Sequence, residues 1–126
     1  MRWLLFFIFF MLLFGVAFAA DIQYLTASYY SRQSLIDEGT AKYNPRFIMA
    51  NGRVFKDDGL TAACNSLRLG DRVRVTNLRN GKSVVVLVTD RTARRFKGKR
   101  IDLSISAMRQ IDGIERGLEK VKVEVI

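Results

Sequence analysis

The chain has 126 residues, of which 21 are Lys or Arg and 12 are Asp or Glu, with no His, one Cys, one Pro and a formal charge of +9. This length holds one domain. The lack of His excludes a Ser-His-Asp triad, a Cys-His pair and a His-ligated metal, and the single Cys excludes an internal disulfide, a Cys-based zinc site and an iron–sulfur cluster. We therefore expect no metal and no cofactor, and any chemistry must use carboxylates, hydroxyls, amines or the thiol.

The N-terminus is typical of an export signal. Arg2 gives a positive start, residues 3–14 are an unbroken apolar run, and Ala17-Phe18-Ala19 has the A-x-A form of a cleavage site. We predict a signal peptide over residues 1–19 and one mature domain over residues 20–126, located in the periplasm or secreted.

A membrane anchor is the alternative interpretation of this apolar segment. Residues 3–20 approach the lower length limit of a spanning helix. Lipid attachment would need a Cys at the cleavage site, and the single Cys of the chain is Cys64. We therefore expect no lipid anchor, and no membrane anchor once the signal is cleaved.

The first half of the mature chain predicts one strand and a long loop. Residues 22–30 are rich in aromatic side chains and predict the strand, while residues 31–59 contain several turn signals and predict a partly structured loop. Residues 72–76 alternate basic and apolar side chains, which is typical of a half-buried strand. Asn80-Gly81 predicts a hairpin in which both residues have positive φ. The following apolar run, residues 84–88, predicts a strand buried on both faces.

The C-terminal part predicts a short strand, a helix and a last strand. Residues 101–103 form the short strand, Ser104 is the expected N-cap of a helix with Met108 and Ile111 on one face, and residues 120–126 alternate again. Five or six short strands with one or two short helices favour an all-β fold. A closed barrel is the economical arrangement because closure removes exposed strand edges.

Several segments, taken in order, resemble one known family, the rare lipoprotein A (RlpA) family. The segments are Ala27–Tyr30, Met49–Gly52, Leu60–Ala63, Val73–Asn77, Asn80–Val86, Val88–Arg91 and Arg100–Ser104. The resemblance implies a six-stranded double-psi β-barrel related to expansins. It also implies a lytic transglycosylase that cuts the MurNAc–GlcNAc strands of peptidoglycan, prefers strands without stem peptides, and leaves 1,6-anhydro ends. The chain departs from the family at Cys64, where the family has His, and at Thr92-Ala93, where it has Gly-Pro.

The lack of His is compatible with lytic chemistry on carboxylates. The sugar's own 6-hydroxyl attacks, so one carboxyl can protonate the glycosidic oxygen and later accept the hydroxyl proton. Asp90, which follows the apolar strand and matches the family's Asp, is the first candidate for this acid and base. Asp102 is the second candidate, because it resembles the acidic site residue of expansins. The structural alternatives are a turn cap for Asp90 and a carboxylate near a helix N-terminus for Asp102.

Further residues are candidates for substrate binding. Hydroxyls and amides hydrogen-bond sugar substituents, and aromatic faces stack on sugar rings. The candidates are Ser28, Tyr29, Tyr30, Asn51, Thr61, Cys64 and Arg91. Tyr29 and Tyr30 point to opposite faces of one strand, so one of them is expected in the core. Cys64 has two alternatives to binding, as a small buried side chain or as a reactive or intermolecular thiol.

The basic surplus predicts an anionic partner. Residues 91–100 contain six bases and no acid. Because export removes the chain from nucleic acid, we expect no nucleic-acid partner, and we expect glycan strands with exposed lactyl carboxylates instead. A generally basic surface is the alternative. We expect a monomer. Two rival functions remain open: an expansin-like protein that binds glycan or loosens the wall without cleavage, and an inhibitor or partner-binding barrel.

Overall fold

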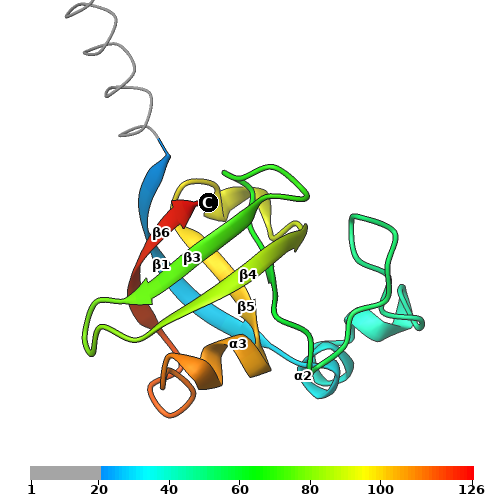
Figure 1. Ribbon diagram of the computed structural model, residues 1–126. Helices are drawn as coiled ribbons and strands as arrows, with labels where there is room; N and C mark the ends of the chain where they lie inside the picture. The colour runs from blue at the N-terminus through cyan, green and yellow to red at the C-terminus, as the bar shows by residue number, and fades with distance from the viewer. Residues whose placement is uncertain (1–20) are drawn as a thin grey trace, which may run out of the picture.

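The computed structural model describes residues 21–126, and the predicted signal peptide lies outside the described residues (Figure 1). The strands are β1 Ile22–Tyr30, β2 Thr61–Ala63, β3 Arg72–Asn77, β4 Ser83–Asp90, β5 Arg100–Ser104 and β6 Glu119–Val125. The helices are α2 Arg32–Asp37 and α3 Ile105–Gln110, with the 3-10 turns η1 Thr40–Lys42 and η2 Arg94–Phe96. No helix within residues 21–126 is long and apolar enough to cross a membrane.

The six strands form one closed barrel in the order β1-β5-β2-β4-β3-β6. Strand pairing is mixed: β1 runs parallel to β5 and β2 parallel to β4, while the other four pairs are antiparallel. This arrangement confirms the predicted double-psi β-barrel. Closure leaves no free strand edge in the barrel, which is the physical advantage expected for so small a sheet.

The barrel interior is the main core. It is filled by alternating apolar side chains from all six strands, because every second residue of a strand faces inward. The buried strand residues are Leu25, Ala27, Ala62, Val73, Val75, Val84, Val86, Val88, Ile101, Leu103, Val121 and Val123. The prediction that residues 84–88 are buried on both faces is wrong, since Val85 is half-buried and Leu87 is 38% exposed. The outer face of β4 meets solvent there, and no helix of residues 21–126 covers Leu87.

The β3–β4 hairpin forms at the expected place with a different turn. Gly81 has φ of 75°, but Asn80 is not among the residues with positive φ. The Gly81 N–H donates to the Asn77 carbonyl at 2.8 Å, and the Asn77 N–H donates to the Lys82 carbonyl at 2.8 Å. The turn is therefore longer than a two-residue hairpin, and one left-handed residue is enough to reverse the chain.

Helix α3 closes one end of the barrel, as Figure 1 shows. The Ser104 side chain accepts a hydrogen bond from the Ala107 N–H, which confirms it as the N-cap. Ala107, Met108 and Ile111 are fully buried and belong to the barrel core. The helix thus seals the interior that the strands leave open.

Residues 31–59 run outside the barrel and contain α2 and η1 (Figure 1). A second small core joins this segment to the barrel's outer face: Met49 and Phe55 pack with Tyr30 of β1 and Ala63 of β2. The rings of Tyr30 and Phe55 stack with centroids 4.5 Å apart. The segment is therefore fixed against one outer face of the barrel, the face that carries the candidate site.

Candidate active site

Strand β2 lies between the two candidate carboxylates. Ala63 of β2 is in register with Asp90 of β4 on one side and with Asp102 of β5 on the other. Neighbouring strands lie about 4.8 Å apart, so the two Asp Cα atoms are roughly 10 Å apart. Ser28 of β1 is in register with Asp102 and extends the row. The barrel thus brings together residues that lie far apart in the sequence.

An irregularity between β2 and β4 turns Asp90 to this face. Ala62 is in register with Val88, but Ala63 is in register with Asp90, so Thr89 is skipped. Val88 faces the interior, and strict alternation would turn Asp90 inward as well. A β-bulge of this kind re-aims a side chain. Asp90 therefore shares the outer face with Ala63.

Asp102 has the environment of a general acid. Burial raises its pKa from 3.8 to about 6, with Glu38 and Asp90 adding to the rise, while the hydrogen bond from Ser28 and the charge of Arg100 oppose it. The Ser28 Oγ donates to Asp102 Oδ1 at 2.9 Å. A carboxyl with this pKa carries its proton for part of the time near neutral pH, as proton donation requires.

Asp90 is held by the backbone. Its Oδ1 accepts hydrogen bonds from the Ala50 N–H at 3.0 Å and from the Arg91 N–H at 2.8 Å. The Ala50 contact joins β4 to the segment of residues 31–59. The carboxylate is thus fixed in orientation, and the same bonds agree with the turn-capping alternative for this residue.

Two buried polar atoms on this face have no hydrogen-bond partner among residues 21–126. They are the Tyr30 hydroxyl and the Thr61 Oγ1. Burial, together with the charges of Asp90 and Asp102, raises the pKa of the Tyr30 phenol, so it stays neutral and can donate a hydrogen bond. Unpartnered buried polar groups are costly in free energy. Both hydroxyls therefore keep unused hydrogen-bonding capacity within the described residues.

The remaining candidate binding residues are divided between two faces. Tyr29 points away from Tyr30 and packs against the barrel core, as expected for one of the two. Asn51 and Thr61 line a hollow of about 480 Å³ whose other walls include Leu87 and Thr89; neither Asp90 nor Asp102 is among its lining residues. The structure thus brings Ser28, Tyr30, Asn51 and Thr61 to the outer face and leaves Tyr29 out.

Cys64 lies inside the barrel core. It is fully buried and unpaired among the described residues. Its Sγ is 3.4 Å from the Ser66 Oγ and 3.7 Å from the Arg100 carbonyl oxygen, and its N–H donates to the Asp90 carbonyl at 3.1 Å. Cys64 therefore supports the backbone beside Asp90, and its thiol faces away from solvent.

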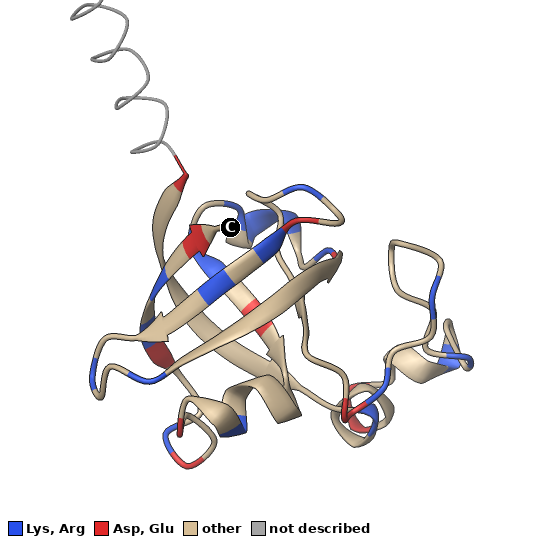
Figure 2. Cartoon of the chain, viewed as in Figure 1, with Lys and Arg blue, Asp and Glu red and all other residues tan. Residues whose placement is uncertain are grey.

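The arginines of residues 91–100 do not form ion pairs with Asp90 within the described part of the chain. The Arg91 guanidinium donates to the carbonyls of Cys64 and Leu67. The guanidinium groups of Arg95 and Arg100 both lie over the Phe96 ring, at 4.6 and 4.3 Å from its centroid. Figure 2 shows basic residues on other strands and loops as well. The positive charge is therefore spread over the molecule.

The sequence gives no signal for three parts of this site. These are the bulge at Thr89, the Ala50 N–H that holds Asp90, and Phe55, which fixes Tyr30. Each depends on a contact between segments far apart in the chain. Within residues 21–126, no cluster of three or more Cys, Asp or Glu side chains could hold a metal ion.

These features define a double-psi β-barrel domain with two carboxylates on its outer face, one on each side of β2. A family model described as "Lytic transglycolase" matches residues 23–123. The chain therefore belongs to the lytic transglycolase family.

Several curated relatives carry names related to peptidoglycan. The chain is 47% identical over 77 residues to the "Probable endolytic peptidoglycan transglycosylase RlpA" of Nostoc sp., covering 61% of this chain and 20% of the relative. It is 45% identical over 92 residues to the "Endolytic peptidoglycan transglycosylase RlpA" of Pseudomonas aeruginosa, covering 70% and 27%. The chain thus spans about a quarter of these relatives. An uncharacterized Synechocystis protein, ssl3177, is 46% identical over 84 residues, covering 64% of this chain and 88% of its own length.

Solved structures with low sequence identity share the fold. The Streptomyces papain inhibitor is 18% identical with a TM-score of 0.61, covering 83% of this chain and 94% of its own. The expansin of Clavibacter michiganensis is 18% identical with a TM-score of 0.56, covering 83% and 50%. At this identity, the likeness shows the barrel fold alone.

Proposed function

We propose that this chain is an exported lytic transglycosylase that cuts the MurNAc–GlcNAc strands of peptidoglycan, with a preference for strands without stem peptides. The observation that carries the proposal is the common register of Asp90 and Asp102 with Ala63 on one outer face. The family membership and the names of the relatives support the reaction class.

Asp102 is the proton donor in this proposal. The sequence favours Asp90 for that role, but the pKa of Asp102 is the one that burial raises to about 6. Asp102 protonates the glycosidic oxygen as the bond from C1 breaks. The sugar's 6-hydroxyl oxygen then bonds to C1, and its proton moves to the Asp102 carboxylate, which restores the starting state. No water is consumed, and the product end is a 1,6-anhydro sugar.

Asp90 and the free hydroxyls position and stabilise the sugar. The Asp90 carboxylate, fixed by two backbone N–H groups, lies beside the positive charge that develops at C1. The Tyr30 hydroxyl and Thr61 Oγ1 gain hydrogen-bond partners from the substrate. A fixed, partly buried set of groups of this kind is what stabilisation of a transition state requires.

A test uses the chain purified from an exporting host and glycan strands stripped of stem peptides. Mass spectrometry should detect 1,6-anhydro ends for the wild type. Asp102→Asn should lower the rate by at least about 100-fold, since it removes the acid, and Asp90→Asn should also lower it. Asp58→Asn, an exposed acid of the outer segment, should have no effect. Products formed at the normal rate by Asp102→Asn would contradict the assignment.

The second candidate function is glycan binding without cleavage, in which the chain acts as an expansin-like protein. Cys64 favours it, because a buried thiol cannot carry the positive charge of the imidazolium that the resemblance places there. Binding of stripped strands without any 1,6-anhydro product would establish this alternative. The same assay therefore distinguishes the two functions.

A further inference from the structure

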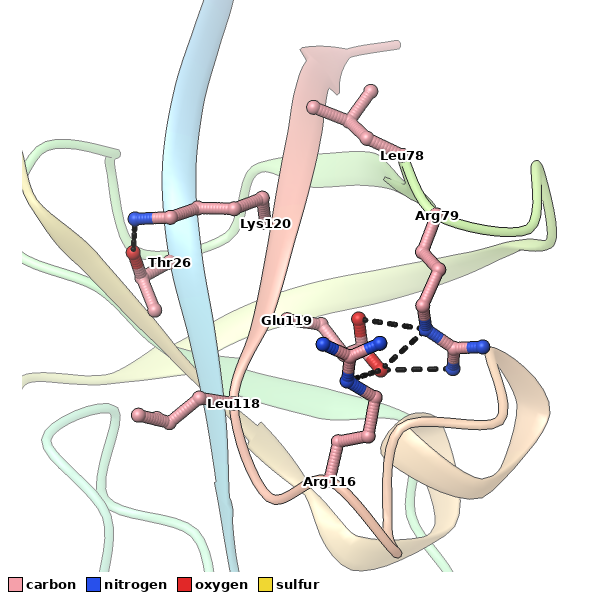
Figure 3. Close-up of a pocket in the computed structure, with 7 residues that line it drawn as sticks. All are labelled: Thr26, Leu78, Arg79, Arg116, Leu118, Glu119 and Lys120. Atoms are coloured by element: carbon pink, nitrogen blue, oxygen red, sulfur yellow. Dashed lines mark hydrogen bonds and ion pairs between the residues drawn. The ribbon is translucent and has the colours of Figure 1, made fainter.

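A groove that the proposed chemistry does not use lies on the outer face of β1 and β6. Figure 3 shows its main hollow, about 510 Å³, with Thr26, Arg116 and Lys120 among the lining residues. A second hollow of about 470 Å³ shares Thr26 and Lys120 with the first and adds Tyr24 and Lys99. We call the two together the β1–β6 groove.

The groove has a surplus of positive charge. Glu119 is the one acid that lines either hollow among the described residues. Its buried carboxylate forms an ion pair with Arg79, whose Nη2 lies 2.9 Å from Oε1. Arg116 touches the same oxygen through Nε at 3.9 Å, and its side chain is 61% exposed. The Arg116 terminal nitrogens make no hydrogen bond within residues 21–126 and lie beside the hollow (Figure 3).

Two lysines add to this surplus. The Lys120 Nζ donates to the Thr26 hydroxyl at 2.9 Å, and a neutral partner leaves its charge uncompensated. Lys99 is exposed and is in no ion pair in the described part of the chain. The groove therefore presents Lys99 and Lys120 without an ion pair among the described residues, and Arg116, which shares the single Glu119 carboxylate with Arg79. Such a positive surface attracts and binds anions.

Apolar side chains lie between these cations. Tyr24 is 67% exposed, Leu78 52% and Leu118 51%. Exposed apolar surface next to these cations suits a ligand that carries both C–H faces and negative charge. A sugar with an acidic substituent has this combination, since its ring packs on apolar side chains while its carboxylate pairs with the cations.

The groove lies on the same outer face of β1 as Ser28 of the candidate active site. Tyr24, Thr26, Ser28 and Tyr30 alternate along β1 and share its outer face. Thr26 lines the groove, and Ser28, two residues further on, binds Asp102. Two residues of a strand span about 7 Å, so the groove begins about one sugar ring from the carboxylates. A glycan strand crossing the site would therefore extend into it.

We propose that the β1–β6 groove is a subsite for a carboxylate-bearing sugar of the glycan strand, with Arg116 and Lys120 pairing with the carboxylate. This inference rests on the proposed function for the identity of the polymer. In this inference, residues other than Asp90 and Asp102 select strands with free lactyl carboxylates. In a strand that bears stem peptides, the lactyl carboxyl forms an amide with the peptide and carries no charge.

The test measures binding separately from cleavage. All chains carry Asp102→Asn, so that strands are not cut during titration. Calorimetry compares stripped strands with the same strands after their carboxylates have been converted to neutral amides. We expect the intact strands to bind about tenfold more tightly. We expect Arg116→Gln combined with Lys120→Gln to remove that difference and to leave the amidated strands bound as before.

Matched charge removals elsewhere serve as the control. Arg68→Gln combined with Lys42→Gln removes the same charge from exposed residues outside the groove and should keep the tenfold preference. Equal affinity for intact and amidated strands, a preference that survives in the groove variant, or no binding of either polymer would each overturn the inference. Formation of 1,6-anhydro ends by the chain with Asp102 intact is unaffected by these results, so failure of the subsite and failure of the proposed reaction are distinguishable.

Discussion

Ser28 on β1 donates a 2.9 Å hydrogen bond to Asp102 on β5, its partner in the parallel register of the two strands. This bond fixes the orientation of a carboxyl whose pKa is raised to about 6. Hydrogen bonding lowers the pKa and burial raises it, and burial has the larger effect here. The bond therefore orients the acid without removing its ability to hold a proton near neutral pH.

The raised pKa of Asp102 predicts a specific dependence of stability on pH. Since the folded chain holds this proton more tightly than the unfolded chain, its contribution to stability is complete below about pH 3.8 and is lost as pH rises through about 6. Asp102→Asn keeps the amide oxygen as an acceptor for Ser28 and removes the ionisation. The unfolding free energy of Asp102→Asn, measured relative to wild type, should therefore increase by on the order of 2 kcal/mol when the pH is raised from about 4 to about 8.

Urea unfolding at both pH values measures this difference. Asp58→Asn, at an exposed turn, is the control and should follow the wild-type dependence. If the difference in unfolding free energy between wild type and Asp102→Asn were the same at both pH values, the pKa of the Asp102 carboxyl would not be raised.

Glu119 predicts a pH dependence of the opposite sign. Its hydrogen bonds from Arg79 lower its pKa below the ordinary value of 4.5, so its contribution is present above that value and is lost as pH falls through the lowered one. Glu119→Gln should destabilise the chain at neutral pH by about 1–3 kcal/mol, because it weakens a charge-assisted bond to a buried group. Thermal unfolding measured from neutral to acidic pH should show that the loss of stability caused by Glu119→Gln becomes smaller in acid. Glu115→Gln, at an exposed residue, should match wild type.

Asp90 is predicted to tether the outer segment as well as to act in the site. Its Oδ1 accepts from the Ala50 N–H, so Asp90→Ala should release this N–H and speed its hydrogen exchange by about tenfold or more. Asp90→Asn retains an acceptor oxygen and should keep most of the protection while losing activity. Exchange followed by mass spectrometry on peptides covering residues 47–53 checks both variants. Equal protection in Asp90→Ala and wild type would contradict the tether.

Tyr30→Phe separates binding from stability. The hydroxyl is buried without a partner within residues 21–126, so its removal costs no hydrogen bond, and the ring stack on Phe55 is retained. We expect unfolding free energy to stay within about 1 kcal/mol of wild type or to rise. Affinity for stripped glycan should fall by about five- to tenfold, if one hydrogen bond to the sugar is lost. A clear loss of stability with unchanged affinity would show a structural role instead.

The Cys64 thiol is predicted to be unreactive in the folded chain. It is fully buried, so a thiol reagent in solution reaches it through unfolding of the barrel. Labelling followed by mass spectrometry should be complete in denaturant and slower by about 100-fold or more under native conditions. Fast native labelling, or a disulfide-linked dimer, would support the alternative of a reactive or intermolecular thiol.

Local patterns were enough to predict most of the elements. The strand of residues 22–30, the Ser104 N-cap, the hairpin at Gly81 and the alternating last strand all follow from side-chain period and turn chemistry, which act over a few residues. The error at residues 84–88 has a physical cause. An apolar run does not say whether a second layer covers the strand, and here Leu87 faces solvent.

The sequence by itself determined most of the strands and the absence of imidazole chemistry, because these follow from residue type and short-range order. The resemblance to the RlpA family implied the six-stranded barrel and the two candidate carboxyls. The tertiary structure decided which residues meet. It turned Asp90 outward through a bulge, buried Asp102 enough to raise its pKa, left the Tyr30 hydroxyl unpartnered, and joined Thr26 and Lys120 in a groove. Strand register, burial and solvent exposure depend on contacts between strands that are distant in the sequence. A local residue pattern does not show which of these contacts form.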